Sequence, residues 1–265
     1  MRLCSIASGS SGNCIFVGGS HSSLLVDAGI SNKRIEEGLR KLDMTGRDLA
    51  GILITHEHSD HIKGLGVLAR KHNMPIFASK GTIAAIKSMT SLGKIEEDLF
   101  CPIEEDKDFF VGELKVHPFA VSHDAAQPVA YRISNGNKKV AVATDLGEYT
   151  PYITENLQNL DALLLEANHD INMLQVGPYP YYLKRRILGE RGHLSNESAG
   201  RLLSEIIHDK MKAVLLGHLS HENNYEKLAY ETVCAEITLS DTPYKATDFF
   251  IQVAKRDALS ECITI

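Results

Sequence analysis

One short segment of the sequence concentrates side chains that bind metal ions. Residues 52–64 read ILITHEHSDHIKG, with three histidines, a glutamate and an aspartate within six residues. Imidazole nitrogens and carboxylate oxygens are ligands for Zn²⁺, Mn²⁺ and Fe²⁺. His56 and His58 can serve one ion while Asp60 and His61 serve another, so this single loop can provide for two metals. The alternative is a polar loop with fortuitous histidines, and the density of ligands argues against it.

Three later positions repeat the pattern of a metal ligand placed after a strand-like run. Asp145 follows KVAVAT, His218 follows KAVLLG, and HPFAVSHDA leads to His123. Each is a weak signal alone, because an aspartate after a strand is usually a turn or cap residue and a histidine there is often a partly buried structural residue. Together with the first loop they give five histidines and two aspartates, which is the set that two ions sharing one carboxylate need.

Short strands and amphipathic helices must position these ligands. Helical spacing of apolar residues follows Ser31 and Ser195, each a candidate N-cap. The Asn-Gly pair in SNGNKK, residues 134–139, predicts a hairpin turn. The mixture predicts an α/β class with mixed sheets, in which loops at strand ends carry the functional site. Apolar, β-branched runs typical of strands lie at 14–17, 24–27, 51–55, 129–133, 139–144, 161–166, 212–217 and 248–254.

Composition limits the class of protein. The chain has 265 residues, 43% of them hydrophobic and 23% charged, which is ordinary for a globular protein. A formal charge of −6 weighs against a purely electrostatic DNA-coating protein, and any site for a polyanion must be a local patch. We expect a single domain over 1–265 with an exposed insertion near 172–190, where residues 172–186 hold two prolines, three tyrosines and a basic cluster.

The cysteines and the amino terminus bear on the cellular compartment. The five cysteines are scattered, odd in number and without a C-x-x-C pair, which predicts reduced thiols in a cytoplasmic protein. The amino terminus turns to Ser and Gly before any apolar run that a signal peptide needs, and no later stretch approaches about 18 apolar residues. The sequence therefore predicts neither export nor a membrane span.

The ligand string resembles the H-x-H-x-D-H signature of the metallo-β-lactamase superfamily. LLVDAG, SHDA, TDLG and GHLS are similar to its other motifs and occur in the same order, so the resemblance covers essentially the whole chain. It implies a four-layer αββα sandwich with two metal ions at one edge of two facing sheets. It assigns His56, His58 and His123 to the first ion, Asp60, His61 and His218 to the second, and Asp145 to a bridge between them.

The same resemblance gives Asp27 a supporting role, orienting the ligand loop through hydrogen bonds. His169 is an alternative ligand for the second ion, and His221 and Asn223 are candidates for positions around it.

Fold alone does not choose the reaction. Asp145 stands where true β-lactamases usually have cysteine, and His58 stands where the diiron flavoprotein branch has glutamate. Thioester hydrolases similar to glyoxalase II and phosphodiesterases such as RNase Z remain. GHLS around His193 resembles a Gly-His-Ser segment of RNase Z, and by that resemblance His193 donates a proton to the leaving oxygen or stabilises phosphoryl charge. The alternative is that His193 only begins a helix.

Longer strings resemble the YycJ/WalJ-type subgroup of bacterial nucleases: SIASGSSGNC, EANHD, GPYPYYLKRRI, GHLSNES and GHLSHENN. This resemblance implies a DNA exonuclease that works from the 5′ end of double-stranded DNA with Mn²⁺ or Zn²⁺, while Fe²⁺ also suits the ligands. Two such ions make a bridging hydroxide available near neutral pH and stabilise charge on phosphorus. Asp60 is expected to align that hydroxide.

Two further segments are candidates for holding the substrate. The loop SGSSGN offers hydroxyls, an amide and backbone N–H groups to a phosphate from Ser8, Ser10, Ser11 and Asn13. Basic residues interleaved with aromatic ones suit a nucleic-acid backbone and an unstacked terminal base, and they occur here as Lys184, Arg185 and Arg186 beside Tyr179, Tyr181 and Tyr182. A plain Ser/Gly turn and a solvated helical face are the respective alternatives.

Two other functions stay open at this point. One is a hydrolase of a small thioester, lactone or cyclic phosphate, and the other is a non-catalytic metal-binding regulator. The sequence leaves undecided the native metal, DNA against RNA, strand polarity, exo against endo mode and the oligomeric state.

Overall fold

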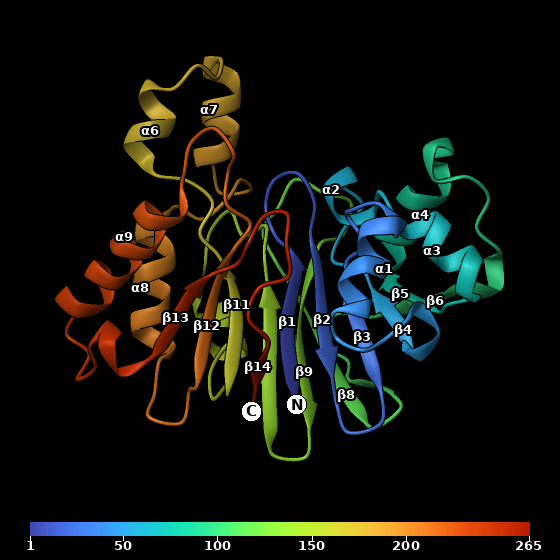
Figure 1. Cartoon of the computed structure of the whole chain (residues 1–265). Coiled ribbons are helices and arrows are strands. Elements are labelled where there is room, and N and C mark those ends of the chain that lie inside the picture. The colour runs from blue at the N-terminus through green and yellow to red at the C-terminus, as the bar shows by residue number, and fades with distance from the viewer.

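The computed structural model describes residues 1–265 and contains two seven-stranded sheets that face each other (Figure 1). In each sheet some neighbouring strands are parallel and others antiparallel, as the sequence predicts. The first sheet has the order β14 (Ile263–Thr264), β1 (Arg2–Ala7), β2 (Cys14–Gly18), β3 (Ser23–Val26), β4 (Gly51–Leu53), β5 (Ile76–Ser79), β6 (Phe100–Ile103). The second has the order β13 (Phe250–Val253), β12 (Ala213–Gly217), β11 (Ala162–Glu166), β10 (Lys138–Ala143), β9 (Val129–Asn135), β8 (Leu114–Ala120), β7 (Phe109–Val111).

All eight predicted strand runs form strands, and six strands escaped prediction. The missed ones are β1, β5 to β8 and β14. Pro102 lies within β6 and Pro118 within β8, and proline is unusual inside a strand because it cannot donate a ladder hydrogen bond. The predicted hairpin turn is confirmed, since Asn135 pairs with Lys138 across a two-residue loop whose Gly136 has φ of 60°.

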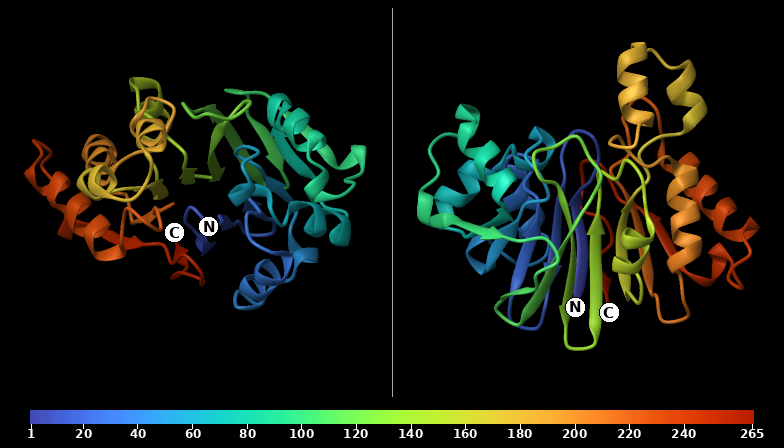
Figure 2. Two further views of the ribbon diagram at one scale, coloured as in Figure 1. Left: turned by 90° about the horizontal axis from the view of Figure 1, so that it is seen from above. Right: turned by 180° about the vertical axis from the view of Figure 1, so that it is seen from behind.

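Helices cover the outer face of each sheet (Figure 2). Ser31 and Ser195 are N-caps as predicted, accepting hydrogen bonds from the backbone N–H of Arg34 and Ser198. The helices are α1 (Asn32–Arg40), α2 (Ser59–Ile62), α3 (Leu65–His72), α4 (Lys80–Ser88), α5 (Pro151–Asn156), α6 (Ile171–Val176), α7 (Tyr181–Leu188), α8 (Asn196–Ile206) and α9 (Glu226–Leu239). Short 3₁₀ helices lie at Gly46–Asp48, Thr90–Leu92, Glu97–Leu99 and Ala246–Asp248.

Three apolar cores hold these layers together. Side chains alternate along each strand, so Leu3 of β1 packs between the two sheets while its neighbour Cys4 packs toward the helices. Residues of α1, α3 and α4 complete the core on the first sheet, and residues of α5, α8 and α9 complete the core on the second. The predicted four-layer αββα sandwich is therefore confirmed.

Helices α6 and α7 form the segment predicted as an insertion, and they project beyond the sheet edge (Figure 1). Val176, Tyr181 and Tyr182 are 86%, 76% and 74% exposed. None of the nine helices has both the length and the apolar composition to span a membrane.

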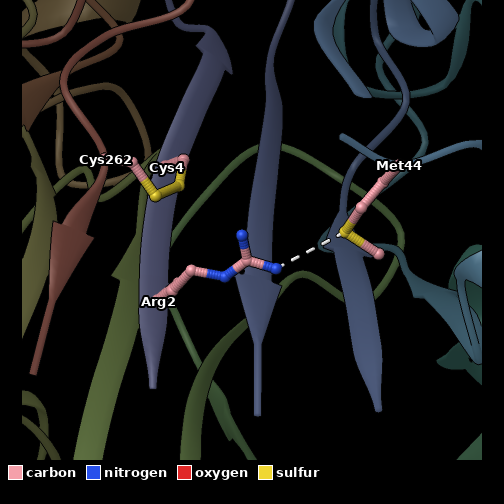
Figure 3. The surroundings of a disulfide bond; sticks show 4 residues. All are labelled: Arg2, Cys4, Met44 and Cys262. Carbon is pink, nitrogen blue, oxygen red and sulfur yellow. Dashed lines mark hydrogen bonds between the residues drawn. A yellow bond between two sulfur atoms is a disulfide. The ribbon is translucent and has the colours of Figure 1, made fainter. Parts of the chain in front are cut away.

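The prediction of five reduced thiols is wrong for two of them. Cys4 and Cys262 form a disulfide, with Cα atoms 4.5 Å apart and 258 residues of separation (Figure 3). The cause is tertiary, because the carboxyl-terminal segment returns to pair β14 with β1 and brings the two ends of the chain together. The amino group of Met1 donates to the carbonyl of Ile265 at 2.9 Å. Cys14, Cys101 and Cys234 are free.

Near the disulfide, Arg2 extends across β2. Its guanidinium lies 5.1 Å from the centre of the Phe16 ring and donates to Met44 Sδ at 3.6 Å (Figure 3).

Glu113, in the turn between β7 and β8, connects the two sheets. Its carboxylate accepts hydrogen bonds from the backbone N–H groups of His21 and Ser22, in the turn between β2 and β3, at 2.7 and 3.0 Å.

Candidate metal centre

Most predicted ligands follow strand ends that gather at one edge of the sandwich, while Asp60 and His61 lie in the short helix α2. Asp27 follows β3, His56 follows β4, Asp145 follows β10 and His218 follows β12. Asp27, Asp145 and His218 have φ of 63°, 61° and 55°. This left-handed conformation is uncommon for residues other than glycine and recurs at functional sites, where the surrounding structure holds it.

The three residues assigned to a first ion lie together. The ligand atoms of His56, His58 and His123 are all within 4.8 Å of one another. His123 Nδ1 lies 3.0 Å from the carbonyl oxygen of Gly192, a hydrogen bond that leaves Nε2 directed to the site. Thr55 Oγ1 lies 3.0 Å from His56 Nδ1, while His56 Nε2 is buried without a hydrogen-bond partner.

The three residues assigned to a second ion also meet within 4.8 Å: Asp60, His61 and His218. Each imidazole is held from behind by a carboxylate. Asp27 Oδ2 lies 2.7 Å from His61 Nδ1, and Glu166 Oε1 lies 2.8 Å from His218 Nδ1. Such contacts fix the ring and present the opposite nitrogen to a metal ion. Asp27 also accepts from the backbone N–H and hydroxyl of Thr55, both at 2.9 Å, so it orients the start of the ligand loop.

Asp145 lies between the two groups. Its Oδ2 is 3.2 Å from His61 Nε2, and its Oδ1 is 3.6 Å from both His123 Nε2 and His218 Nε2. The Oδ2 atom is buried and accepts no hydrogen bond. A buried carboxylate oxygen and a buried imidazole nitrogen without partners are costly unless a cation binds them. The residues present therefore fit divalent metal ions.

Glu166 is the important residue that sequence reasoning missed. Its Oε1 lies 2.7 Å from His193 Nδ1 as well as 2.8 Å from His218 Nδ1. Its Oε2 accepts from the backbone N–H groups of Leu146 and Leu194 at 2.9 and 3.2 Å. Burial alone raises the pKa of Glu166, but the two imidazoles lower it to about 2, so the group is ionised. Glu166 is the last residue of the run DALLLE, so a charged side chain closing an apolar run is the signal that could have indicated it.

His193 faces the same pocket as the ligands and is 14% exposed in its side chain. The structure thus brings both residues predicted as catalytic, Asp60 and His193, into one pocket of about 220 Å³. The pocket is lined by Ser10, His58, Asp60, Asp145, Asn168, Tyr179, Leu183, Arg186, Ile187, His193, His218 and Ser220.

The loop predicted to hold the substrate divides into two pairs of residues. Ser8 and Asn13 are buried, and they support the centre from behind. Ser8 Oγ accepts from the backbone N–H of His218 at 2.9 Å, and the backbone N–H of Asn13 donates to the carbonyl of Asp60 at 2.8 Å. Ser10 and Ser11 are exposed, and of these two Ser10 lines the pocket.

Lys184 and Arg185 do not line the pocket, whereas the next residue, Arg186, does. Lys184 Nζ donates to the carbonyl of Gln175 at 2.7 Å, and the Arg185 guanidinium lies 6.0 Å from the centre of the Tyr181 ring. Both side chains therefore make contacts within the projecting helices.

The remaining candidates lie outside the ligand groups. His169 is buried, neither ring nitrogen has a partner, and burial lowers its pKa to about 4. His221 is exposed and pairs with Glu222, and the backbone N–H of Asn223 donates to Ser220 Oγ at 3.2 Å. The structure brings neither His169 nor His221 into the groups of ligand atoms within 4.8 Å of one another.

Comparison with known proteins agrees with this geometry. A family model described as the β-lactamase superfamily domain matches residues 23–218. Exodeoxyribonuclease YycJ of Bacillus anthracis is 41% identical over 228 residues, which are 86% of this chain and 86% of that protein. Exodeoxyribonuclease WalJ of Streptococcus pneumoniae is 41% identical over 236 residues, which are 89% of this chain and 88% of that protein.

Solved structures share the whole fold. Zn²⁺-bound PqqB from Methylobacterium extorquens has a TM-score of 0.71 at 16% identity, and all of both chains is covered. The short form of human tRNase Z has a TM-score of 0.66 at 15% identity, again over all of both chains. At such identities the likeness shows the fold alone. The family model and the relatives nevertheless settle the affiliation: the chain belongs to the metallo-β-lactamase superfamily of hydrolases and, within it, to the family of the exodeoxyribonucleases YycJ and WalJ.

Proposed function

We propose that the protein is a metal-dependent phosphodiesterase that degrades DNA from an end, as a 5′ to 3′ exonuclease on duplexes. The observation that carries the proposal is the pair of ligand groups on either side of Asp145, with His193 in the same pocket. The names of the relatives YycJ and WalJ support DNA as the substrate.

We propose that two divalent cations, Mn²⁺ or Zn²⁺ with Fe²⁺ as a further candidate, occupy this centre. His56, His58 and His123 would hold one ion, Asp60, His61 and His218 the other, and Asp145 would contact both. When bound, two such cations supply an activated water as the nucleophile and stabilise negative charge on a phosphoryl group.

The chain's own residues position the reacting groups. Glu166 accepts the Nδ1 proton of His193, so the Nε2 atom of His193 is the atom left to exchange a proton with the leaving oxygen. The same carboxylate holds His218, so one buried group sets the orientation of a ligand and of the proposed acid. Asp60, whose side chain is 23% exposed and lies between His61 and His218, would align the attacking water.

The decisive experiment is a panel of end-labelled single- and double-stranded DNA and RNA, each incubated with Mn²⁺, Zn²⁺ or Mg²⁺. We expect stepwise shortening of duplex DNA from the 5′ end with at least one of these metals. His58→Ala should lose this activity, while His21→Ala, an exposed histidine in a turn, serves as the matched control and should keep it.

Two results would refute the proposal. One is duplex DNA that stays intact under every metal tested while a thioester or lactone is turned over, and the other is equal DNA degradation by His58→Ala and the unmodified protein.

A further inference from the structure

One face of α7 forms a wall of the metal pocket. Leu183, Arg186 and Ile187 line it together with Tyr179, which precedes the helix. The three helical residues are three and four positions apart, so they share one side of α7. Tyr181 and Tyr182 are 76% and 74% exposed on other sides of the helix.

This wall is fixed relative to the metal ligands. The Arg186 guanidinium binds the carboxylate of Asp124 through two atoms, with Nη2 donating to Oδ1 at 2.9 Å and Nε donating to Oδ2. Asp124 directly follows His123. Arg191 donates to the carbonyl of His123 through Nη2 and Nε, at 2.9 and 3.1 Å. The end of α7 is therefore tied to the loop that carries a ligand of the first proposed ion.

Arg186 keeps hydrogen-bond donors free. A guanidinium has five N–H donors, and the structure uses two of them, both for Asp124. Its Nη1 atom makes no hydrogen bond, and the side chain is 47% exposed. Because Asp124 already orders the side chain, a phosphate oxygen that binds the remaining donors does not have to immobilise a free arginine. Arg186 is also the only lysine or arginine that lines the pocket.

Apolar side chains lie beside this cation. Tyr179, Leu183 and Ile187 offer an aromatic ring and aliphatic surface, while Ser10, Asn168 and Ser220 offer hydrogen-bonding groups elsewhere on the lining. A cation next to aromatic and apolar surface suits a nucleotide, whose phosphate and base make different contacts. The pocket volume of about 220 Å³ limits what enters to a small group at a time.

We propose that this face of α7 is the binding site for the terminal nucleotide of a DNA strand. Arg186 binds the phosphate through Nη1, and Tyr179, Leu183 and Ile187 contact the base. This inference rests on the proposed exonuclease function and deepens it, because a wall that accepts an unstacked end favours cleavage from an end over cleavage within a strand.

The first test compares Arg186→Gln with Arg201→Gln, a matched control on an exposed position of α8, using end-labelled duplex DNA across a salt series. The metal content of each variant is measured first. We expect Arg186→Gln to raise KM for DNA by about 10- to 100-fold, the effect of losing a hydrogen bond to a charged group. The slope of log KM against log salt should fall by about 0.7 to 0.9, which corresponds to one lost phosphate contact. Arg201→Gln should change neither quantity.

A second pair of variants separates binding from structure. Asp124→Asn releases the hold on α7 but keeps the guanidinium, so its salt slope should match the unmodified protein. Leu183→Ala should raise KM for DNA while its salt slope stays that of the unmodified protein, because it removes no phosphate contact. Two results would overturn the inference. One is a salt slope of Arg186→Gln equal to that of the unmodified protein, and the other is a salt slope that falls equally in Arg186→Gln and Asp124→Asn. If the unmodified protein leaves DNA intact with every metal, the proposed function fails instead.

Discussion

At the scale of single residues, the orientation of the histidines depends on two buried carboxylates behind them. Asp27 holds His61, and Glu166 holds both His193 and His218. All five of these side chains are largely buried, and each hydrogen bond directs the opposite ring nitrogen toward the pocket. The arrangement explains how loops at strand ends keep several imidazoles in fixed orientations.

Glu166→Gln tests this arrangement, because glutamine keeps the shape of the side chain and loses its charge. We expect a fall of about 10- to 100-fold in kcat or in metal affinity, the usual cost of changing a residue that supports a metal ligand. Chelator competition gives the metal affinity, and steady-state kinetics separates kcat from KM. Glu205→Gln, on the exposed side of α8, is the control. Unchanged kcat together with unchanged metal affinity would show that Glu166 does not position these histidines.

Some residues of the site could be predicted from the sequence, and others could not. Asp145 and His218 were predictable because each follows an apolar run that has already ended, so the polar residue stands out. Glu166 occupies the last position of the run itself and looked like part of the strand. For Lys184, Arg185 and Arg186 the composition was clear, but which residue faces the pocket depends on the rotation of α7. Tertiary contacts such as that between Arg186 and Asp124 set that rotation.

At the scale of elements, turns from both sheets meet at the edge remote from the metal centre. Glu113, between β7 and β8, binds the turn between β2 and β3. Gly112 before it has φ of 59°, and a Cβ atom there would lie 1.9 Å from Ser22 Oγ, so the close approach of the two turns requires glycine. This contact fixes how the two sheets are spaced at one end.

The contact predicts a pH effect on stability. Hydrogen bonds from Ser22 and from the backbone N–H of His21 lower the pKa of Glu113 to about 2. A carboxyl group whose pKa is lower in the folded state stabilises the protein above its unfolded pKa, about 4.3, and loses that contribution as pH falls toward 2. Glu113→Gln should therefore lower the free energy of unfolding at pH 6 by about 1 kcal/mol or less, since the group is accessible to solvent. Urea denaturation at pH 6 and pH 3 measures the difference in free energy of unfolding between Glu113→Gln and the unmodified protein. A difference of the same size at both pH values would rule out the ionic contribution.

At the scale of the whole molecule, the disulfide joins residues that are almost a full chain length apart. Cys4 lies on β1, and Cys262 lies just before β14, which pairs with β1. No spacing rule applied to the sequence could pair them, because their proximity depends on the completed first sheet. The local runs, by contrast, predicted an α/β class with mixed sheets, because continuous apolar runs are typical of strands buried on both faces, and the resemblance to a known fold implied the four layers.

Removing the disulfide should destabilise the protein. We expect Cys4→Ser with Cys262→Ser to lower the free energy of unfolding by about 2 to 4 kcal/mol, because the crosslink restricts the unfolded chain. Urea denaturation with and without dithiothreitol measures this loss, and the reductant should affect the unmodified protein alone. Cys234→Ser, at a free and partly buried thiol, is the control. Equal stability of the double variant and the unmodified protein under oxidising conditions would contradict the prediction.

The hydrogen bond between Met1 and Ile265 has a consequence for rearranging the gene. With its two ends in contact and crosslinked nearby, the folded chain is close to a closed ring. A short linker could join the present ends, and the ring could be opened at the exposed Gly136–Asn137 hairpin, where no neighbouring atom lies within 4 Å of a Cβ built on the glycine. Such a circular permutant would place β10 to β13 before the first sheet and β7 to β9 after it, while leaving every ligand loop intact.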